Sequence, residues 1–321
     1  REGTDIEDSS KTKIPRCKPF LESSAEDLFP YDGMIRVRFA GQGVTSPNLS
    51  RKHPTPRRRI CFAVNSVYPK RNHLSSMEKH AIIASELRIF PEWRPIMSDS
   101  LQSLFSRCDS VLVFDTETSG LSWQRDEIIE FSAIRLTASG TEEVDEFIRC
   151  TRSLPPRIVE LTGITDELLR EEGIGKQAFA ELLAALLTPG TMLAAYNAQF
   201  DLLFLYAFLQ KYGDARLLQD KQKLDLLTVY RDRRAYPHRL CNAIEQYDLQ
   251  DRVTNSHRAI DDVRATVEVL RAMETERDDL ERYVDLFGYS SKYGISGPRI
   301  SSVRYLPQGY EPKAAPLYAG L

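Results

Sequence analysis

The pattern of hydrophobic and polar residues becomes regular after about residue 109, where it predicts three consecutive strands. Residues 111–114 are all apolar, which is typical of a central strand covered on both faces. The β-rich segments 127–136 and 142–149 follow, and only a short Ser-Gly turn separates these two. Because short connections join antiparallel neighbours, we expect antiparallel strands at the start of this region.

Helical and strand-like patterns alternate over the rest of the region. Further strands are expected at residues 192–196 and 223–227. The expected helices are a stretch containing residues 161–165, then 179–187, 200–212, 239–247 and 258 to about 287. Three strands followed by alternating helices and strands describe an α/β domain over residues 109–287, with a mixed sheet of five strands, one of them antiparallel, and helices on both faces.

Residues 1–108 are less regular and form an N-terminal extension to which the sequence assigns no function. Strands are expected at residues 34–39 and 60–64, joined by a long basic loop. Helical spacing predicts a helix over residues 75–90 and a short one at about residues 101–105.

Residues 288–321 form a tail that is rich in Gly, Pro, Tyr and Ser. The tail contains Arg299 and Arg304 but no carboxylate before Glu311. We expect it to be extended and to pack on the core through three tyrosines, Tyr305, Tyr310 and Tyr318.

The formal net charge is only −3, but the charges are unevenly distributed. No Asp or Glu occurs from Gly33 to Met77, the stretch that holds Arg36, Arg38, Arg51, Lys52, Arg57, Arg58, Arg59, Lys70 and Arg71. Such a basic stretch is either a solvated surface or a contact for nucleic acid.

Five cysteines are widely scattered, and no two of them form a C-x-x-C pair. The spacing indicates neither a zinc site nor a disulfide framework, so a reduced, cytoplasmic setting is expected. No apolar run reaches the roughly 18 residues that span a bilayer, and the polar start is not that of a signal peptide. We therefore expect no membrane partner.

The first candidate for chemistry is the pair of carboxylates that follows the apolar run 111–114. Asp115 and Glu117 share one face of the strand, because strand side chains repeat every second residue. Two anions together at the end of an apolar strand are unfavourable unless a cation neutralises them, which suggests a divalent metal. The alternative is that one carboxylate caps the following turn while the other is solvated.

Two later segments supply further candidates. Asp201 ends the segment Asn197-Ala-Gln-Phe-Asp201, in the first turn of a helix that follows a strand. His257 precedes the long C-terminal helix, and Asp262 lies one turn inside it. Taken singly, a helix-starting Asp is often a cap, and a lone His is often a surface residue.

Together, four segments resemble the histidine-containing branch of the DEDD exonucleases, the DEDDh group of DnaQ-like 3′–5′ exonucleases. The segments are Phe114-Asp-Thr-Glu-Thr-Ser-Gly120, Leu161-Thr-Gly-Ile-Thr165, Asn197-Ala-Gln-Phe-Asp201 and His257-x-Ala-x-x-Asp262. This group includes the proofreading epsilon subunit of DNA polymerase III and ribonuclease T. The resemblance covers about residues 110–275, and it implies a ribonuclease H-like fold. One departure is Tyr196, which stands where many members have His.

The resemblance implies that Asp115, Glu117, Asp201 and Asp262 hold two Mg²⁺ or Mn²⁺ ions, since carboxylates and water suit hard cations. One metal would activate the attacking water, and the other would stabilise the leaving 3′ oxygen. His257 would accept the proton of the water, because the reference pKa of histidine is about 6.5, and Glu117 would help to orient that water.

Four further residues are expected to contact the terminal nucleotide: Thr118, Gly120, Leu121 and Asn197. The alternatives for these four are turn-forming and packing roles. Asp261 is about 100° around the helix from Asp262 and should face elsewhere. Asp225 is expected to order the local backbone.

The function that the resemblance implies is metal-dependent 3′–5′ hydrolysis of the terminal phosphodiesters of DNA to nucleoside 5′-monophosphates, of a proofreading or repair type. The expected partner is a nucleic acid 3′ end, preferably single-stranded, and a DNA polymerase is a candidate partner. The enzymatic alternative is a 3′–5′ exoribonuclease or RNA end trimmer. The alternative from another class is a non-catalytic module that binds a polymerase or nucleic acid.

An acidic active site repels phosphate, so the basic stretch 33–77 is expected to contact the substrate strand. Reversing the charges of Arg57, Arg58 and Arg59 should therefore raise KM several-fold and flatten its dependence on salt. Steady-state kinetics over a salt series measure both effects. A salt response identical to that of the unaltered protein would contradict the assignment.

Overall fold

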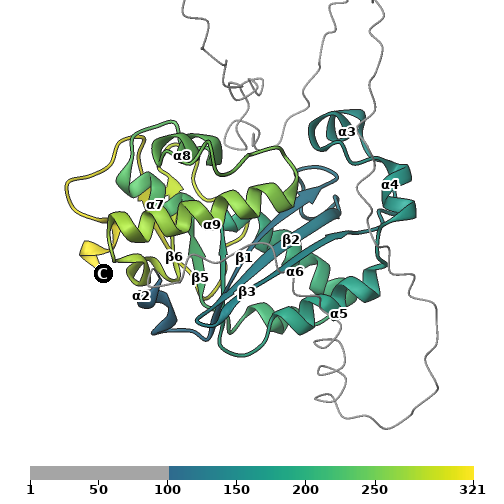
Figure 1. Ribbon diagram of the computed structural model, residues 1–321, viewed down its shortest axis with the longest axis horizontal. Coiled ribbons are helices and arrows are strands. Elements are labelled where there is room, and N and C mark those ends of the chain that lie inside the picture. Colours follow the sequence, from purple (N-terminus) through teal and green to yellow (C-terminus); the bar gives the residue numbers. More distant parts are fainter. Residues whose placement is uncertain (1–100) are drawn as a thin grey trace, which may run out of the picture.

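The computed structural model describes residues 101–321, in which helices cover a mixed main sheet (Figure 1). The expected elements at 34–39, 60–64 and 75–90, and the basic stretch 33–77, lie outside the described residues. Five strands form the main sheet in the order β3-β2-β1-β4-β5. They are β1 Ser110–Thr118, β2 Ile128–Thr137, β3 Gly140–Phe147, β4 Thr191–Ala195 and β5 Lys223–Asp225.

The directions of the strands agree with the sequence prediction. Strand β2 is antiparallel to both of its neighbours, β1 and β3, whereas β1, β4 and β5 run parallel to one another. The sheet therefore has one antiparallel member, as expected for the ribonuclease H-like class.

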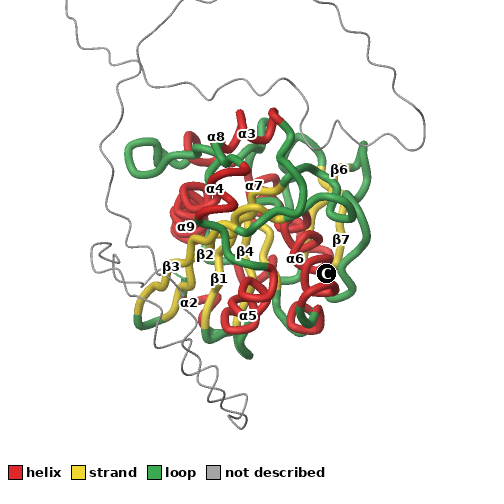
Figure 2. The backbone as a smooth tube through the Cα atoms, turned by 90° about the vertical axis from the view of Figure 1, so that its right-hand side faces the viewer, coloured by secondary structure: helices red, strands yellow, loops and turns green. Residues whose placement is uncertain are grey.

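Helices cover both faces of the sheet, and Figure 2 shows α9 and α6 on opposite sides of the strands. The helices are α2 Gln102–Phe105, α3 Pro156–Thr162, α4 Asp166–Glu171, α5 Lys176–Leu186, α6 Ala198–Tyr212, α7 Leu226–Arg233, α8 Leu240–Gln246 and α9 Ala259–Glu276. Short 3-10 helices are η1 Ala215–Leu218, η2 Leu280–Tyr283 and η3 Leu317–Gly320. Among residues 101–321, each helix is too short or too polar to cross a bilayer.

Strand β1 separates two hydrophobic clusters, which explains its continuous apolar run. Val111 and Val113 pack in the cluster that contains side chains of α7, α8 and α9. Leu112 and Phe114 pack in the cluster that contains side chains of α5 and α6. Because side chains alternate along a strand, Asp115 and Glu117 lie on the face of the sheet that α9 covers, and Thr116 lies on the face that α6 covers.

One helix prediction and one strand prediction were wrong in detail. The motif 161–165 is not one helical stretch, because Gly163 adopts a left-handed conformation (φ 72°) and ends α3. Thr165 then caps α4 by accepting a hydrogen bond from the N–H of Leu168. The expected strand 223–227 ends at Asp225, and the helix α7, which the sequence did not predict, begins at the next residue.

The long C-terminal helix ends at Glu276, about ten residues earlier than expected. Arg233 explains this end, because its guanidinium donates to the carbonyls of Met273 (2.5 Å) and Arg277 (3.2 Å). The same guanidinium forms an ion pair with Asp279 at 2.5 Å. The chain then turns through η2 into a strand.

The tail is more ordered than the extended segment that was expected. Strands β6 Leu286–Ser290 and β7 Arg304–Gln308 form a separate parallel pair. Tyr305 is buried and Tyr318 packs edge-on against Tyr283, as predicted. Tyr310 is 44% exposed, so its expected role in core packing was wrong, although its carbonyl accepts the N–H of Tyr236.

Strand β6 lies beside β5 and runs in the same direction. At the start of β5, the N–H of Asp285 donates to the carbonyl of Lys223 at 2.7 Å. Just beyond the end of β5, the hydroxyl of Thr228 accepts the N–H of Gly288 at 2.7 Å. The carboxyl ends of β4, β5 and β6 therefore lie at one edge of the molecule, where ligands of parallel sheets bind.

Candidate active site

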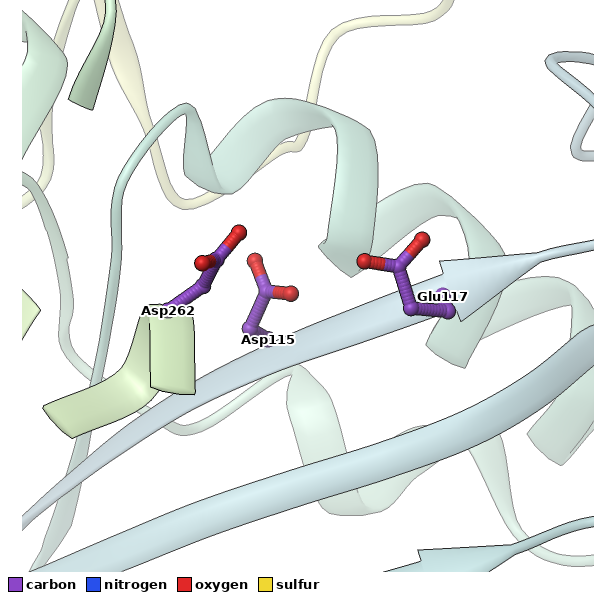
Figure 3. A group of neighbouring side chains, drawn as sticks. All are labelled: Asp115, Glu117 and Asp262. Atoms are coloured by element: carbon purple, nitrogen blue, oxygen red, sulfur yellow. The ribbon is translucent and has the colours of Figure 1, made fainter. Parts of the chain in front are cut away.

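Three carboxylates converge at this edge. Asp115 and Glu117 come from β1, and Asp262 comes from the first turn of α9 (Figure 3). Each offers a carboxylate oxygen within 4.8 Å of those of the other two. The structure thus brings together three of the four residues predicted to bind metal.

The topology of the sheet leaves room for this cluster. Strand β4 pairs with β1 only as far as the pair Val113 and Ala194, so Asp115 and Glu117 lie beyond the end of β4. Helix α9 packs against β1 and β2 and supplies Asp262 on the same face. The cluster therefore has two origins. Alternation along β1 puts Asp115 and Glu117 on one face, and the first turn of α9 brings Asp262 to that face.

Burial and mutual repulsion make the cluster electrostatically unfavourable without a counter-ion. Burial raises the pKa of Asp115 well above its usual range, and the charges of Asp201, Asp262 and Glu117 raise it further. The pKa of Glu117 rises for the same reasons, and burial raises the pKa of Asp262 to about 7. Carboxylates held this closely fit a hard divalent cation, whose charge would compensate them.

Asp201 approaches the site from the other side of β1. It lies in the first turn of α6, is almost fully buried and does not belong to the group of three. Its Oδ1 accepts the N–H of Thr116 at 3.1 Å and the Thr116 hydroxyl at 2.6 Å. Burial raises the pKa of Asp201 to about 7. Thr116, the residue between the two strand carboxylates, thereby positions the fourth one.

His257 lies on an exposed segment just before α9, in the left-handed region of backbone conformation (φ 57°). It is not part of the close carboxylate group. Nearby, the side-chain amide of Asn255 donates to Oδ1 of Asp262 at 2.7 Å. Sequence reasoning missed Asn255, although an amide so close to His257 in the motif segment was a usable signal.

Two aspartates take the structural places that were predicted for them. Asp261 faces away from the cluster and accepts the hydroxyl of Ser256 at 2.6 Å. Asp225 accepts the N–H of Ala198 at 3.0 Å and the hydroxyl of Thr228 at 2.5 Å. Asp225 thus joins the first turns of α6 and α7.

The four predicted nucleotide contacts lie at the same edge. The hydroxyl of Thr118 donates to the carbonyl of Gly120 at 2.7 Å, which forms the turn after β1. Leu121 follows with its side chain 50% exposed. Asn197 adopts a left-handed conformation (φ 69°) at the start of α6. Turn formation therefore accounts for Thr118, while Leu121 offers an exposed apolar side chain beside the site.

Sequence reasoning also missed the pair Glu130 and Arg258. Glu130 is fully buried on β2, directly opposite Glu117 in the strand register. Its carboxylate accepts Arg258 Nη2 at 2.6 Å and Arg258 Nε at 3.0 Å. Its second oxygen accepts the N–H of Ala259, the first residue of α9, at 3.1 Å. Glu130 is the lone carboxylate within β2, Ile128–Thr137, and a carboxylate inside this largely apolar strand was the available signal.

This pair fixes the start of α9 and places a cation beside the cluster. Arg258 lies between His257 and the helix that carries Asp262, so its position determines theirs. Its charge opposes the upward shift that burial gives to the pKa of Glu117. Burial also raises the pKa of Glu130, and the hydrogen bonds and charge of Arg258 counteract that shift.

Comparison with known proteins places these residues in context. A family model described as Exonuclease matches residues 112–270. DNA polymerase III subunit epsilon of Treponema pallidum is 33% identical over 166 residues, which are 50% of this chain and 74% of that relative. A solved structure of Exonuclease I matches with a TM-score of 0.50 and 25% identity, over 55% of this chain and 43% of that one.

The matched part is a small fraction of some relatives. DNA polymerase III PolC-type of Bacillus subtilis is 31% identical over 210 residues, which are 62% of this chain but only 14% of that protein. The corresponding protein of Halalkalibacterium halodurans is 35% identical over 179 residues, 12% of its length. The chain therefore spans about an eighth of the length of these two PolC-type relatives.

The repulsion in the cluster predicts how stability depends on pH and metal. The folded, metal-free protein binds protons on Asp201 and Asp262 more tightly than the unfolded chain does. The contribution of these groups to the free energy of unfolding is therefore lost as the pH rises from about 4 to about 7. In EDTA, thermal unfolding should show that loss for wild type, and Mg²⁺ should raise Tm more at pH 8 than at pH 5.

The matched variants are Asp262→Asn and Asp261→Asn. In EDTA at pH 8, Asp262→Asn should be more stable than wild type by at least about 1 kcal/mol, because one repelling charge is gone. It should also respond less to Mg²⁺, whereas Asp261→Asn, whose charge raises the pKa of Asp262 from outside the cluster, should change both quantities much less. Equal responses of the two variants would contradict the assignment of the cluster.

Removing Arg258 would leave the buried charge of Glu130 without a cation, and the N–H of Ala259 would be its remaining hydrogen-bond donor. We expect Arg258→Met to lower the free energy of unfolding by about 3 kcal/mol, and Glu130→Gln in the same chain to restore part of it. Arg264→Met is the matched control on the same helix, because its pair with Glu143 is exposed and should contribute less than about 1 kcal/mol. Urea unfolding measures the free energy of unfolding of these three variants. Equal losses for Arg258→Met and Arg264→Met would contradict the role of Arg258 in stabilising buried Glu130.

Proposed function

We propose, because the chain belongs to the DnaQ-like exonuclease family, that it is a 3′–5′ exonuclease that shortens DNA and releases nucleoside 5′-monophosphates. The observation that carries the proposal is the convergence of Asp115, Glu117 and Asp262 at the edge of the sheet. Water attacks the terminal phosphorus, the bond to the 3′ oxygen breaks, and the shortened strand keeps a 3′ hydroxyl.

The carboxylates would hold two Mg²⁺ or Mn²⁺ ions, with Asp201 contributing from α6. When bound, such ions lower the pKa of a water and stabilise the charge on the leaving 3′ oxygen. Hard cations prefer oxygen ligands, and the donor set here consists of carboxylates. The raised pKa values of Asp201 and Asp262 favour cation binding at neutral and higher pH, where the carboxylates are charged.

The side chains of this chain would then handle the water and its proton. Glu117 orients the attacking water from β1, while His257 accepts its proton at an imidazole nitrogen. Because His257 lies on an exposed segment, solvent can carry that proton away. Arg258 and Glu130 hold this segment and the start of α9 against β2, the neighbour of β1.

Substrate contacts would come from the turn after β1 and the start of α6. Leu121 offers a side chain that is 50% exposed for the terminal base, and the backbone of Thr118 and Gly120 would lie along the sugar. Asn197 is placed to donate or accept a hydrogen bond at the start of α6.

DNA is favoured over RNA as the substrate because the relatives of this chain include DNA polymerase III proteins. The relatives in Treponema pallidum and Bacillus subtilis are both DNA polymerase III proteins. A proofreading or repair role beside a DNA polymerase follows as part of the proposal. A single-stranded 3′ end is the preferred substrate, since the terminal nucleotide must reach carboxylates that are partly buried.

The test uses single-stranded and duplex DNA and RNA oligomers with a 5′ label, in Mg²⁺, in Mn²⁺ and in EDTA. Wild type should give a ladder of 5′-labelled products on DNA in either metal and none in EDTA. Asp115→Asn should abolish the ladder, and His257→Gln should lower kcat by about 10² to 10⁴. Faster shortening of RNA would reassign the substrate.

Asp261→Asn is the matched control, because it removes a carboxylate one residue from the cluster without touching the proposed ligands. It should retain wild-type kcat. If wild type and Asp115→Asn are equally inert on all four substrates, the chain is a non-catalytic module.

A further inference from the structure

The tail after Asp285 is basic and lies outside the matched family range 112–270. Residues 286–310 include Lys292, Arg299 and Arg304 but no Asp or Glu. Neither the metal cluster nor the proposed chemistry uses this segment. Its positive charge is opposite to that of the carboxylate cluster, so it could attract the phosphates that the cluster repels.

Gln199 fastens the tail to the helix that carries Asp201. Its side-chain amide donates to the carbonyls of Ser296 at 3.1 Å and Pro298 at 2.8 Å. Its side-chain oxygen accepts the hydroxyl of Tyr305 at 2.7 Å. Gln199 is 9% exposed, so these bonds are shielded from water. The loop between β6 and β7 is therefore held against the first turn of α6, beside the active site.

A cavity of about 110 Å³ lies where this loop meets α7. Its lining includes Arg231, His238, Ser290, Ser291 and Lys292, and none of the described residues that line it is acidic. The carbonyl of His238 accepts the hydroxyl of Tyr196, the residue just before Asn197, at 2.8 Å. The cavity is thus linked to the start of α6 on this side as well.

A second cavity, of about 280 Å³, lies beside the start of α9 but has a different character. Asp251 and Asp261 line it together with Arg252 and Arg264. Its carboxylates would repel an anion, so among the described residues the tail cavity is the better fit for a phosphate group.

We infer that the tail cavity binds a backbone phosphate of the substrate strand, upstream of the nucleotide that is being removed. This inference rests on the proposed function. Cationic side chains and serine hydroxyls are the usual partners of phosphate oxygens, and such contacts fix a strand without reading its sequence. Tyr293, the residue after Lys292, is 43% exposed, and this exposure lets its ring stack on a base. Lys292 Nζ lies 4.6 Å from the ring centroid, so a cation and an aromatic ring lie together here.

Phosphate binding in the tail cavity would compensate for the repulsion between the carboxylate cluster and the negatively charged substrate strand. Because a phosphate upstream of the scissile bond is held by cations, the 3′ end reaches the carboxylates with part of its charge neutralised. The binding energy of the cavity is available only to strands long enough to reach it. Long substrates should therefore have lower KM than short ones.

The test compares Lys292→Glu with wild type on oligothymidylates from two to about twelve nucleotides long. For wild type, KM should fall with length and then level off. For Lys292→Glu, KM of the long substrates should rise about tenfold, while kcat stays the same. The slope of log KM against log salt should become shallower by about 0.7. Hydrolysis of the p-nitrophenyl ester of thymidine 5′-monophosphate, which is too short to reach the cavity, should be unchanged.

Lys211→Glu is the matched control. Lys211 is also an exposed lysine stacked on the tyrosine that follows it, with Nζ 4.9 Å from the Tyr212 ring centroid. It lies near the opposite end of α6, about 15 Å along the helix from Asp201. This variant should keep the length dependence of wild type.

An unchanged length dependence in Lys292→Glu would overturn the inference, and so would an equal rise of KM in Lys211→Glu. If wild type hydrolyses neither the oligomers nor the nitrophenyl ester, the proposed function fails instead. Fluorescence anisotropy of a labelled twelve-nucleotide strand then decides about the cavity: weaker binding by Lys292→Glu supports it, and equal binding overturns it.

Discussion

Repulsion among Asp115, Glu117 and Asp262 is the constraint on which the arrangement of this domain depends. Two of these carboxylates come from the central strand, and the third comes from a helix that is distant in sequence. Burial makes each charge more unfavourable, so the rest of the structure must hold them in place until a cation arrives. The surrounding hydrogen bonds hold the carboxylates in place.

Each carboxylate is held by a different kind of support. The strand carboxylates are fixed by β1, whose neighbours on both faces are hydrophobic clusters. Asn255 holds Asp262, and Thr116 holds Asp201 on the far side of the strand. Glu130 and Arg258 set the start of α9, and Arg233 sets its end. A helix fixed at both ends cannot slide to relieve the repulsion.

The sequence was sufficient for those features that depend on local periodicity. The places of the five strands along the chain and the common face of Asp115 and Glu117 follow from local residue patterns, and the antiparallel pairing follows from the short connections between strands. The period of a helix also separated Asp262 from Asp261 correctly. From the residues alone, the role of each acidic group stayed open. The resemblance to a known family identified the four carboxylates that are expected to bind metal.

Features that depend on distant partners were not predictable in this way. Glu130 and Arg258 are 128 residues apart, and nothing in either segment identifies the other. The early end of α9 depends on Arg233, which lies 40 residues before the carbonyl that it binds. The parallel pairing of β6 with β7 was missed because the segment between them reads only as an irregular tail.

The long separation between Gln199 and its partners has a consequence for biosynthesis. Ser296 and Pro298 follow Gln199 by 97 and 99 residues, so these bonds cannot form until residues 296–298 have left the ribosome. Asp262 likewise joins the strand carboxylates only after α9 has been made. A nascent chain that ends before residue 258 contains the residues of all five strands of the main sheet but lacks both Asp262 and the basic tail. The carboxylate cluster therefore cannot be completed on a chain that has been made only that far.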